Sequence, residues 1–196
     1  MIRRMAIGAL VVLVVVALVW ALSAIAPRLP ARATPAAASP AAAPAAGAER
    51  RITATLYYVA EDGLTLPGVQ REVPFAEGIG EQARRIIEAQ LSEAPAPYVS
   101  PVPAGTTLRA LFMGERGEAF VDLGGEIRSK HIGGSLGEIF TTYAIVNSLT
   151  VNLPAITRVQ ILIDGKEVET LAGHVDLRHP LQKNLKWTEL QTDNDK

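Results

Sequence analysis

The residues of this chain that could carry out chemistry are a serine, several carboxylates and three histidines. Ser135 is followed at the third position by Glu138. This is the spacing of a capping box, in which a hydroxyl and a carboxylate bond the exposed N–H groups at the start of a helix. The residues around Ser135 lack the pattern of a nucleophile elbow. We therefore expect these two side chains to begin a helix rather than to form a hydrolase site.

Three aspartates stand beside strand-like segments, namely Asp122, Asp164 and Asp176. A carboxylate in such a place readily caps a turn or accepts bonds from backbone N–H groups, so turn roles are the favoured interpretation. A hydrolase that uses Asp122 and Glu138 stays a less favoured alternative, because the sequence does not give the distance between the two carboxylates.

Metal and cofactor sites are not indicated. The only histidines are His131, His174 and His179, and their spacing matches no established ligand motif. The chain has no cysteine, which excludes disulfides, thiol catalysis and thiolate metal sites. The glycine pairs at 124–125 and 133–134 lack the context of a phosphate-binding loop. We predict no catalytic residue, no cofactor and no metal, and we expect that the protein is not an enzyme.

These side chains are positioned by one central unit, residues 135–166. Apolar residues recur at three- and four-residue steps from Leu136 to Val146, which predicts a helix packed on one side. Off the buried stripe of this helix lie Thr141, Thr142 and Asn147. A buried strand is predicted at 158–163, and Asp164-Gly165 supplies the turn of a hairpin.

The remaining sequence adds strands and one more helix. Strands are predicted at 52–58, 64–73, 108–113 and 118–123, and a helix at 80–91. We predict an α+β fold in which two helices pack on a mixed or antiparallel sheet, within one domain at residues 50–182. Residues 183–196 are predicted to be a polar, frayed C-terminal tail.

The N-terminal segment 1–26 is predicted to be a transmembrane anchor. No charged residue occurs from Met5 to Ala26, and about 20 apolar residues at ~1.5 Å each span a hydrocarbon core. A cleaved secretory signal is the alternative, since Ala24-Ile25-Ala26 has a small-x-small form. We favour the anchor because the apolar run exceeds the ~7–15 residues of a signal peptide and because Pro27 would directly follow the cut.

The segment 27–49 is rich in Ala and Pro, which predicts an extended tether. The short N-terminal stub favours a cytoplasmic N-terminus and an extracytoplasmic C-terminal domain in a single-pass membrane protein. The part from Glu49 onward holds every acidic residue and is net negative. Nucleic acid is therefore not an expected partner.

Three short motifs stand at 145–150, 159–166 and 169–174. In this order and spacing they closely resemble the signature of the GerMN domain of sporulation and spore-germination proteins, and the resemblance covers roughly residues 56–181. Earlier pieces at 71–73, 103–106 and 121–123 agree with it. The signature residues, expected to be structural, are Arg71, Asp122, Ser135, Glu138, Asn147, Asp164, Gly165, Gly173 and His174.

This resemblance implies a module similar to the ring-building domains of envelope-spanning machines. Such a module is expected to act through protein contacts, with envelope proteins or further copies of itself as partners, rather than through catalysis. Many relatives carry a lipobox cysteine, which this chain lacks, and the best-known relative has two such domains where this chain has room for one. The alternative is a binding domain for cell-wall glycan or a small ligand, with exposed Tyr57, Tyr58 or Trp187 as a platform.

Overall fold

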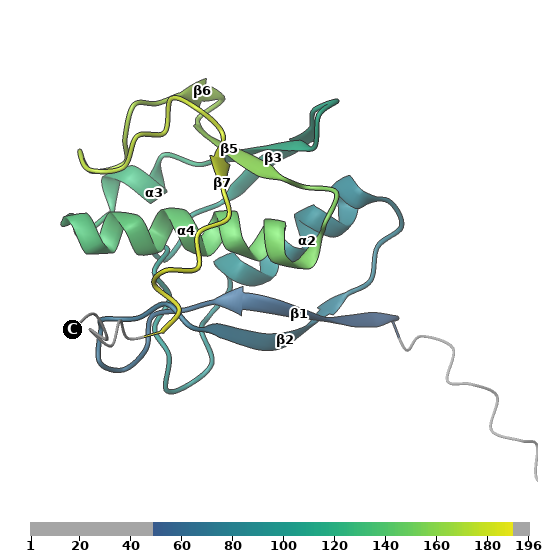
Figure 1. The fold of residues 1–196 in the computed structure, drawn as a ribbon, viewed down its shortest axis with the longest axis horizontal. Helices are drawn as coiled ribbons and strands as arrows, with labels where there is room; N and C mark the ends of the chain where they lie inside the picture. The colour runs from purple at the N-terminus through teal and green to yellow at the C-terminus, as the bar shows by residue number, and fades with distance from the viewer. Residues whose placement is uncertain (1–48, 190–196) are drawn as a thin grey trace, which may run out of the picture. The chain divides into compact units, whose positions relative to one another are not determined.

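The computed structural model describes residues 49–189 (Figure 1). The predicted anchor at 1–26, nearly all of the predicted tether and the end of the tail at 190–196 lie outside the described residues. Within 49–189 no helix has the length and apolar character needed to cross a membrane. The part of the chain from Glu49 onward is a compact unit with its own hydrophobic core.

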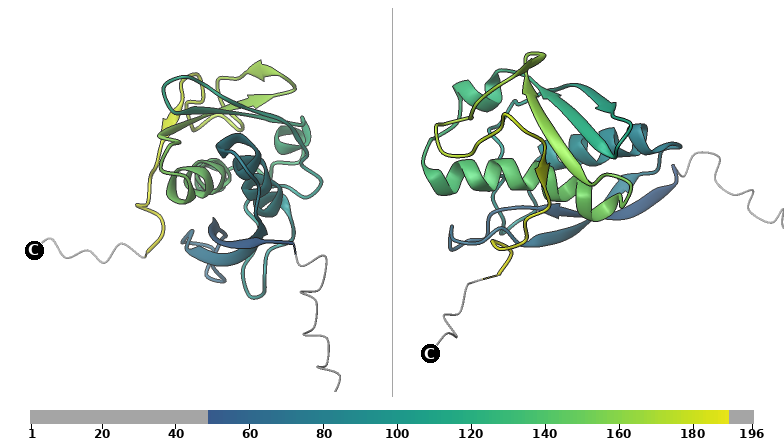
Figure 2. Two further views of the ribbon diagram at one scale, coloured as in Figure 1. Left: turned by 90° about the vertical axis from the view of Figure 1, so that its right-hand side faces the viewer. Right: turned by 45° about the horizontal axis from the view of Figure 1, so that its top comes forward.

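Two helices lie between two sheets, so the described chain has three layers (Figures 1 and 2). The elements are β1 (Arg51–Tyr57), β2 (Gly68–Pro74), α2 (Ile79–Leu91), β3 (Leu108–Met113), β4 (Glu118–Leu123), α3 (Glu126–Ser129), α4 (Ser135–Asn152), β5 (Arg158–Ile163), β6 (Lys166–Glu167) and β7 (Leu181–Gln182). Helices α2 and α4 contact each other, and both contact β1 on one side. On the other side, α2 contacts β3 and α4 contacts β5.

The two sheets correct the prediction of a single sheet under two helices. β1 and β2 form a separate antiparallel pair, whereas β3, β4, β5 and β6 form the larger sheet, in which β7 also pairs with β5. Apolar alternation shows that each strand has a buried face, but it does not show which strands pair with one another. The α+β class and the order of the long elements are as predicted.

The central helix α4 is buried on most of its surface because sheets cover it from both sides. Thr141, Thr142 and Asn147, which were predicted to lie off the buried stripe, are all buried. The hydroxyl of Thr141 lies 2.6 Å from the Pro101 carbonyl and 2.9 Å from the Gly137 carbonyl, so its O–H has an acceptor although the side chain is buried. The prediction of a helix packed on one side is therefore wrong for α4.

The larger sheet is mixed and ends in a tight hairpin. β4 pairs with β3 antiparallel and with β5 parallel, and the chain between β4 and β5 crosses over through α3 and α4. β5 and β6 form the predicted hairpin, with Asp164 at φ 52° and Gly165 at φ 76° in its turn. Positive φ at both central residues is the geometry that makes Asp-Gly a hairpin sequence.

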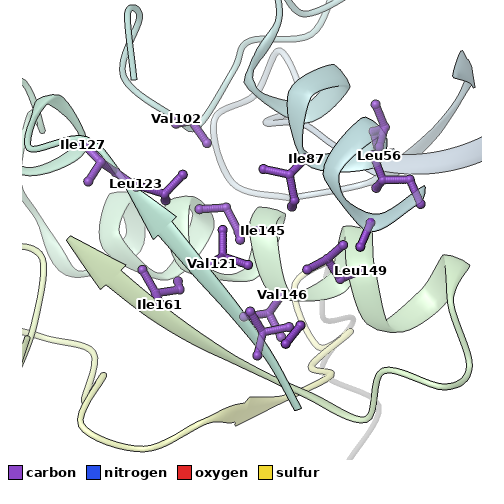
Figure 3. Packing of buried hydrophobic residues seen from close by; sticks show 14 of the residues in the cluster. Leu56, Ile87, Val102, Val121, Leu123, Ile127, Ile145, Val146, Leu149 and Ile161 are labelled. Atoms are coloured by element: carbon purple, nitrogen blue, oxygen red, sulfur yellow. The ribbon is translucent and has the colours of Figure 1, made fainter. Parts of the chain in front are cut away.

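The core fills the space between α4, α2 and both sheets (Figure 3). Val121 and Leu123 of β4 and Ile161 of β5 face Ile145 and Leu149 of α4, and these five side chains are at most 1% exposed. Each such aliphatic side chain contributes about 1.5–3 kcal/mol by leaving water. This core fixes the position of α4. Most of the signature residues described below either lie on α4 or belong to a loop that is attached to it.

Candidate functional site

The start of α4 does not use the predicted capping box. Gly134, at φ 82°, occupies the N-cap position, and no side chain caps the helix there. Ser135 is exposed within the first turn, and the Glu138 side chain turns away to a distant loop. The physical reason is burial: Glu138 is 0% exposed, and a buried carboxylate is stable only where several donors reach it.

Those donors are backbone N–H groups of the loop at 171–175. The Leu171 N–H donates to Glu138 Oε1 at 2.8 Å and the His174 N–H donates to Oε2 at 2.7 Å. Burial raises the pKa of Glu138, but the backbone N–H groups of this loop outweigh it and hold the pKa below its ordinary value. A general acid needs a raised pKa, so this ionised carboxylate is suited to hold a loop and not to donate a proton.

His174 and Gly173 belong to the same cluster. The His174 ring is about half-exposed, and its Nδ1 lies 3.1 Å from Glu138 Oε2. Gly173 has φ 99°, a conformation that side chains other than glycine's rarely adopt. Its N–H donates to Thr170 Oγ1 at 2.9 Å. The signature thus joins Glu138, Gly173 and His174 in one attachment of a loop to α4.

Asp122 forms the second cluster, at the end of β4. Its Oδ1 accepts the Gly165 N–H at 2.7 Å, and its Oδ2 lies 3.2 Å from Arg109 Nε. Arg109 Nη1 also lies 3.5 Å from Asp164 Oδ1. The structure therefore brings Asp122, Asp164 and Gly165 together, as a support for the β5–β6 turn. The Asp122 and Glu138 carboxylates bind different loops through backbone N–H groups, which is the turn role that the sequence favoured for Asp122.

Asn147 attaches the C-terminal segment to α4. Its Nδ2 donates to the Asn184 carbonyl at 2.8 Å, and its Oδ1 accepts the Asn184 N–H at 3.0 Å. Further on, Trp187 packs edge-on against Phe140 with ring centroids 6.3 Å apart. Residues 183–188, which the sequence analysis assigned to the polar tail, therefore pack on the domain.

Arg71 of β2 connects the smaller sheet to the segment that follows α2. Its Nη1 donates to the Tyr58 hydroxyl at 3.1 Å and to the Glu93 carbonyl at 3.2 Å. Both tyrosines are buried, since Tyr57 is 3% exposed and Tyr58 is 0% exposed. The proposed platform of exposed tyrosines is thus wrong, since both rings fill core space, and Trp187 is itself partly buried.

Two side-chain amides, which the sequence did not indicate, form hydrogen bonds to backbone groups of β1. Gln90 Oε1 accepts the Tyr57 N–H at 2.9 Å and its Nε2 donates to the Tyr57 carbonyl at 2.8 Å. Asn152 does the same for Thr55, at 2.8 and 2.7 Å. The sequence could have indicated that Gln90 is buried, because Gln90 lies on the same face of α2 as Ala83, at the i+7 position of the i, i+3, i+4, i+7 stripe.

The described surface also has an apolar pocket that the sequence did not predict. It has a volume of about 610 Å³ and lies between residues 59–63, 99–104 and 130–141, the last of which includes the start of α4. Leu136 and Phe140 of α4 line it, together with prolines of the 99–104 loop. This volume falls within the ~300–1,000 Å³ range of ligand-binding pockets.

The floor of the apolar pocket is fixed by hydrogen bonds. The Thr141 hydroxyl lies 2.6 Å from the Pro101 carbonyl and 3.0 Å from His131 Nε2. The Gly133 N–H donates to His131 Nδ1 at 2.9 Å, so Nδ1 is the unprotonated ring nitrogen and Nε2 carries the proton toward Thr141. Two residues of opposite charge line the pocket as well, Glu61 from the 59–63 segment and Lys130 from the 130–141 segment.

Comparisons with known proteins show the family to which the chain belongs and the fold that it shares. A model of the Germane family, described as sporulation and spore germination, matches residues 55–169. The chain matches no curated protein. Among the similar solved structures are three with sequence identities of 18–22%, and at this level the likeness shows the fold alone.

The tandem GerMN domains of the sporulation protein GerM from Bacillus subtilis are 18% identical with a TM-score of 0.51, covering 69% of this chain and 46% of that one. The first GerMN domain of the same protein is 19% identical with a TM-score of 0.50, covering 68% and 96%. A putative lipoprotein from Clostridium perfringens is 22% identical with a TM-score of 0.49, covering 68% and 88%. The family match confirms the predicted GerMN resemblance, and the chain belongs to the Germane family of sporulation and spore germination.

Proposed function

We propose that this chain is a non-enzymatic module of the cell envelope, anchored in the membrane by residues 1–26, whose folded domain lies outside the cytoplasm and acts by binding proteins. The observation that carries the proposal is how the signature side chains are used. Glu138, Asp122 and Asn147 each bond backbone groups of another segment. Side chains used in this way hold loops in place on the domain, which supports a binding role rather than chemistry on a substrate.

The apolar pocket supports the choice of protein binding over catalysis. Its lining is mostly apolar, and two of the lining residues, Ile132 and Val99, are 97% and 59% exposed. Exposed apolar side chains that gather around a hollow are typical of interaction sites. Membership of the Germane family supports a sporulation- or germination-related process.

The test is cross-linking of the full-length chain in its native membrane, followed by identification of the proteins attached to it. Wild type is compared with Ile132→Asp, at the pocket, and with the matched control Phe112→Asp, an exposed apolar residue of β3. We expect specific envelope proteins, or further copies of the chain, on wild type and on the control but not on Ile132→Asp. The same partners on all three, or none on any, would contradict the proposal. Protease protection of the domain in intact cells would contradict its placement outside the cytoplasm.

A small-ligand function is the second candidate, and the volume of the apolar pocket is the observation that favours it. Native mass spectrometry of the protein purified from its own cells tests it. A bound small molecule that is lost when Phe140, on the pocket wall, is replaced by alanine would support this candidate. Ligand-free protein of the sequence mass alone would count against it.

A further inference from the structure

We propose that the apolar pocket receives Ile132 from a second copy of this chain, in a symmetric dimer in which Lys130 of each copy faces Glu61 of the other. This inference rests on the proposed function, since it names the protein that the pocket binds. It is carried by the exposure of Ile132, by the place of Ile132 in the lining of the pocket, and by two lining residues of opposite charge from separate segments.

Ile132 is the first observation. At 97% exposed it is by far the most exposed of the large hydrophobic side chains among residues 49–189. It precedes Gly133 and Gly134, both with φ above 80°, so the backbone turns sharply there and presents the side chain away from the domain. An isoleucine that leaves water contributes about 1.5–3 kcal/mol, a gain that this position does not make within one copy.

The place of Ile132 is the second observation. It lines the apolar pocket, as does Val99 of the 99–104 loop, which is also exposed. A projecting side chain and a hollow of matching character on the same face are self-complementary, because a two-fold axis brings each projection to the other copy's hollow. A single copy cannot achieve this burial, since Ile132 points into solvent while the pocket beside it remains open.

The two opposite charges in the lining are the third observation. Lys130 and Glu61 both line the apolar pocket and are both exposed. The Lys130 ammonium donates to the Ala104 carbonyl at 3.3 Å, a neutral partner that leaves its charge uncompensated at that contact. In the proposed dimer a two-fold axis passes between Lys130 and Glu61, so that Lys130 of one copy lies against Glu61 of the other. The two opposite-charge contacts then fix the orientation of the dimer.

The experiment uses charge reversal and sedimentation equilibrium. The fragment 49–196 contains the complete core described above, so it can be studied in solution. We expect wild type to dimerise with rising concentration, and Lys130→Glu and Glu61→Lys each to dimerise about tenfold or more weakly, because each variant sets two like charges against each other. An equimolar mixture of the two variants should recover dimerisation, because both contacts of the mixed dimer then join opposite charges.

Two further variants locate the contact. Ile132→Asp should weaken dimerisation about 100-fold or more, because it removes two buried apolar side chains and places charges in the pocket. Phe112→Asp, at a matched exposed apolar residue of β3, should leave dimerisation unchanged. A monomeric wild type, a dimer that tolerates Ile132→Asp, a dimer broken by Phe112→Asp, or a mixture that fails to recover would each overturn the inference. If Ile132→Asp still abolishes cross-links to other envelope proteins while the fragment is monomeric, the proposed function stands and only the dimer fails.

Discussion

Replacing Glu138 by glutamine should destabilise the domain strongly although it changes no side-chain volume. Both carboxylate oxygens accept backbone N–H groups, from Leu171 and His174, at 2.8 and 2.7 Å. Glutamine keeps one acceptor oxygen and sets an NH₂ group against the other N–H. An unsatisfied buried N–H costs about 1–3 kcal/mol, and the remaining bond loses its charge-assisted strength. We therefore expect the free energy of unfolding to fall by about 2–4 kcal/mol.

The same substitution should remove part of the pH dependence of stability. The pKa of Glu138 in the folded state lies below its ordinary value of 4.5, so the unfolded chain binds a proton more readily than the folded one. The stabilisation by the carboxylate is therefore complete above pH 4.5 and is lost as the pH falls through the folded pKa. The difference in unfolding free energy between wild type and Glu138→Gln should therefore shrink as the pH is lowered from 7 through the folded pKa of Glu138.

Urea unfolding of the fragment 49–196 at several pH values measures both effects. Glu115→Gln is a suitable control, because Glu115 is exposed in the β3–β4 turn and a surface change of this kind usually alters stability by no more than about 0.5 kcal/mol. A loss below about 0.5 kcal/mol for Glu138→Gln at pH 7, or a difference that does not shrink in acid, would refute the assigned role of this carboxylate.

Three further substitutions test the other signature residues. Asn147→Ala should cost about 1–3 kcal/mol, because it removes both bonds to Asn184, and it should make residues 183–188 more sensitive to trypsin; unchanged digestion would contradict that attachment. Asp122→Ala should cost a similar ~1–3 kcal/mol in urea unfolding, because the Gly165 N–H loses its acceptor, and an effect within ~0.5 kcal/mol would speak against it. Gly173→Ala should cost about 1–2 kcal/mol, because alanine is strained at φ 99°, and a neutral result by thermal unfolding would show that the loop can relax.

The sequence pattern predicted individual strands and turns well where the residues themselves favour one local conformation. The strands at 108–113, 118–123 and 158–163 coincide with β3, β4 and β5, because β-branched and apolar residues on a pleated surface leave a clear period of two. Asp164-Gly165 forms the predicted hairpin turn, because few other sequences tolerate two successive residues at positive φ.

The arrangement of those elements was harder to predict. The period of α4 shows an apolar stripe, but burial of Thr141 and Ser148 depends on a second sheet that the helix sequence does not encode. Tyr58 is buried with Arg71 against it, although the alternation of the 52–58 segment does not show which of its faces the rest of the domain covers. Long-range pairing decides these positions, and single-sequence periodicity carries no information about it.

The candidate site shows the same division. The motifs identified the signature residues, yet Glu138 serves a loop more than 30 positions away instead of its own helix start. The capping-box pattern is local, whereas the deciding interaction is the donation of backbone N–H groups to a buried carboxylate. The apolar pocket is assembled from three separate segments, so no single stretch of sequence indicates it.

The most direct test of the account places a photo-activated cross-linker at position 132 of the full-length chain and activates it in living cells. A cross-linker at position 112 of β3 is the matched control, since both native residues are large, apolar and exposed. If the apolar pocket is a protein-binding surface, position 132 should capture a defined protein, with a further copy of this chain as the expected product, and position 112 should not. Equal capture from both positions, or no protein captured at position 132, would contradict the account.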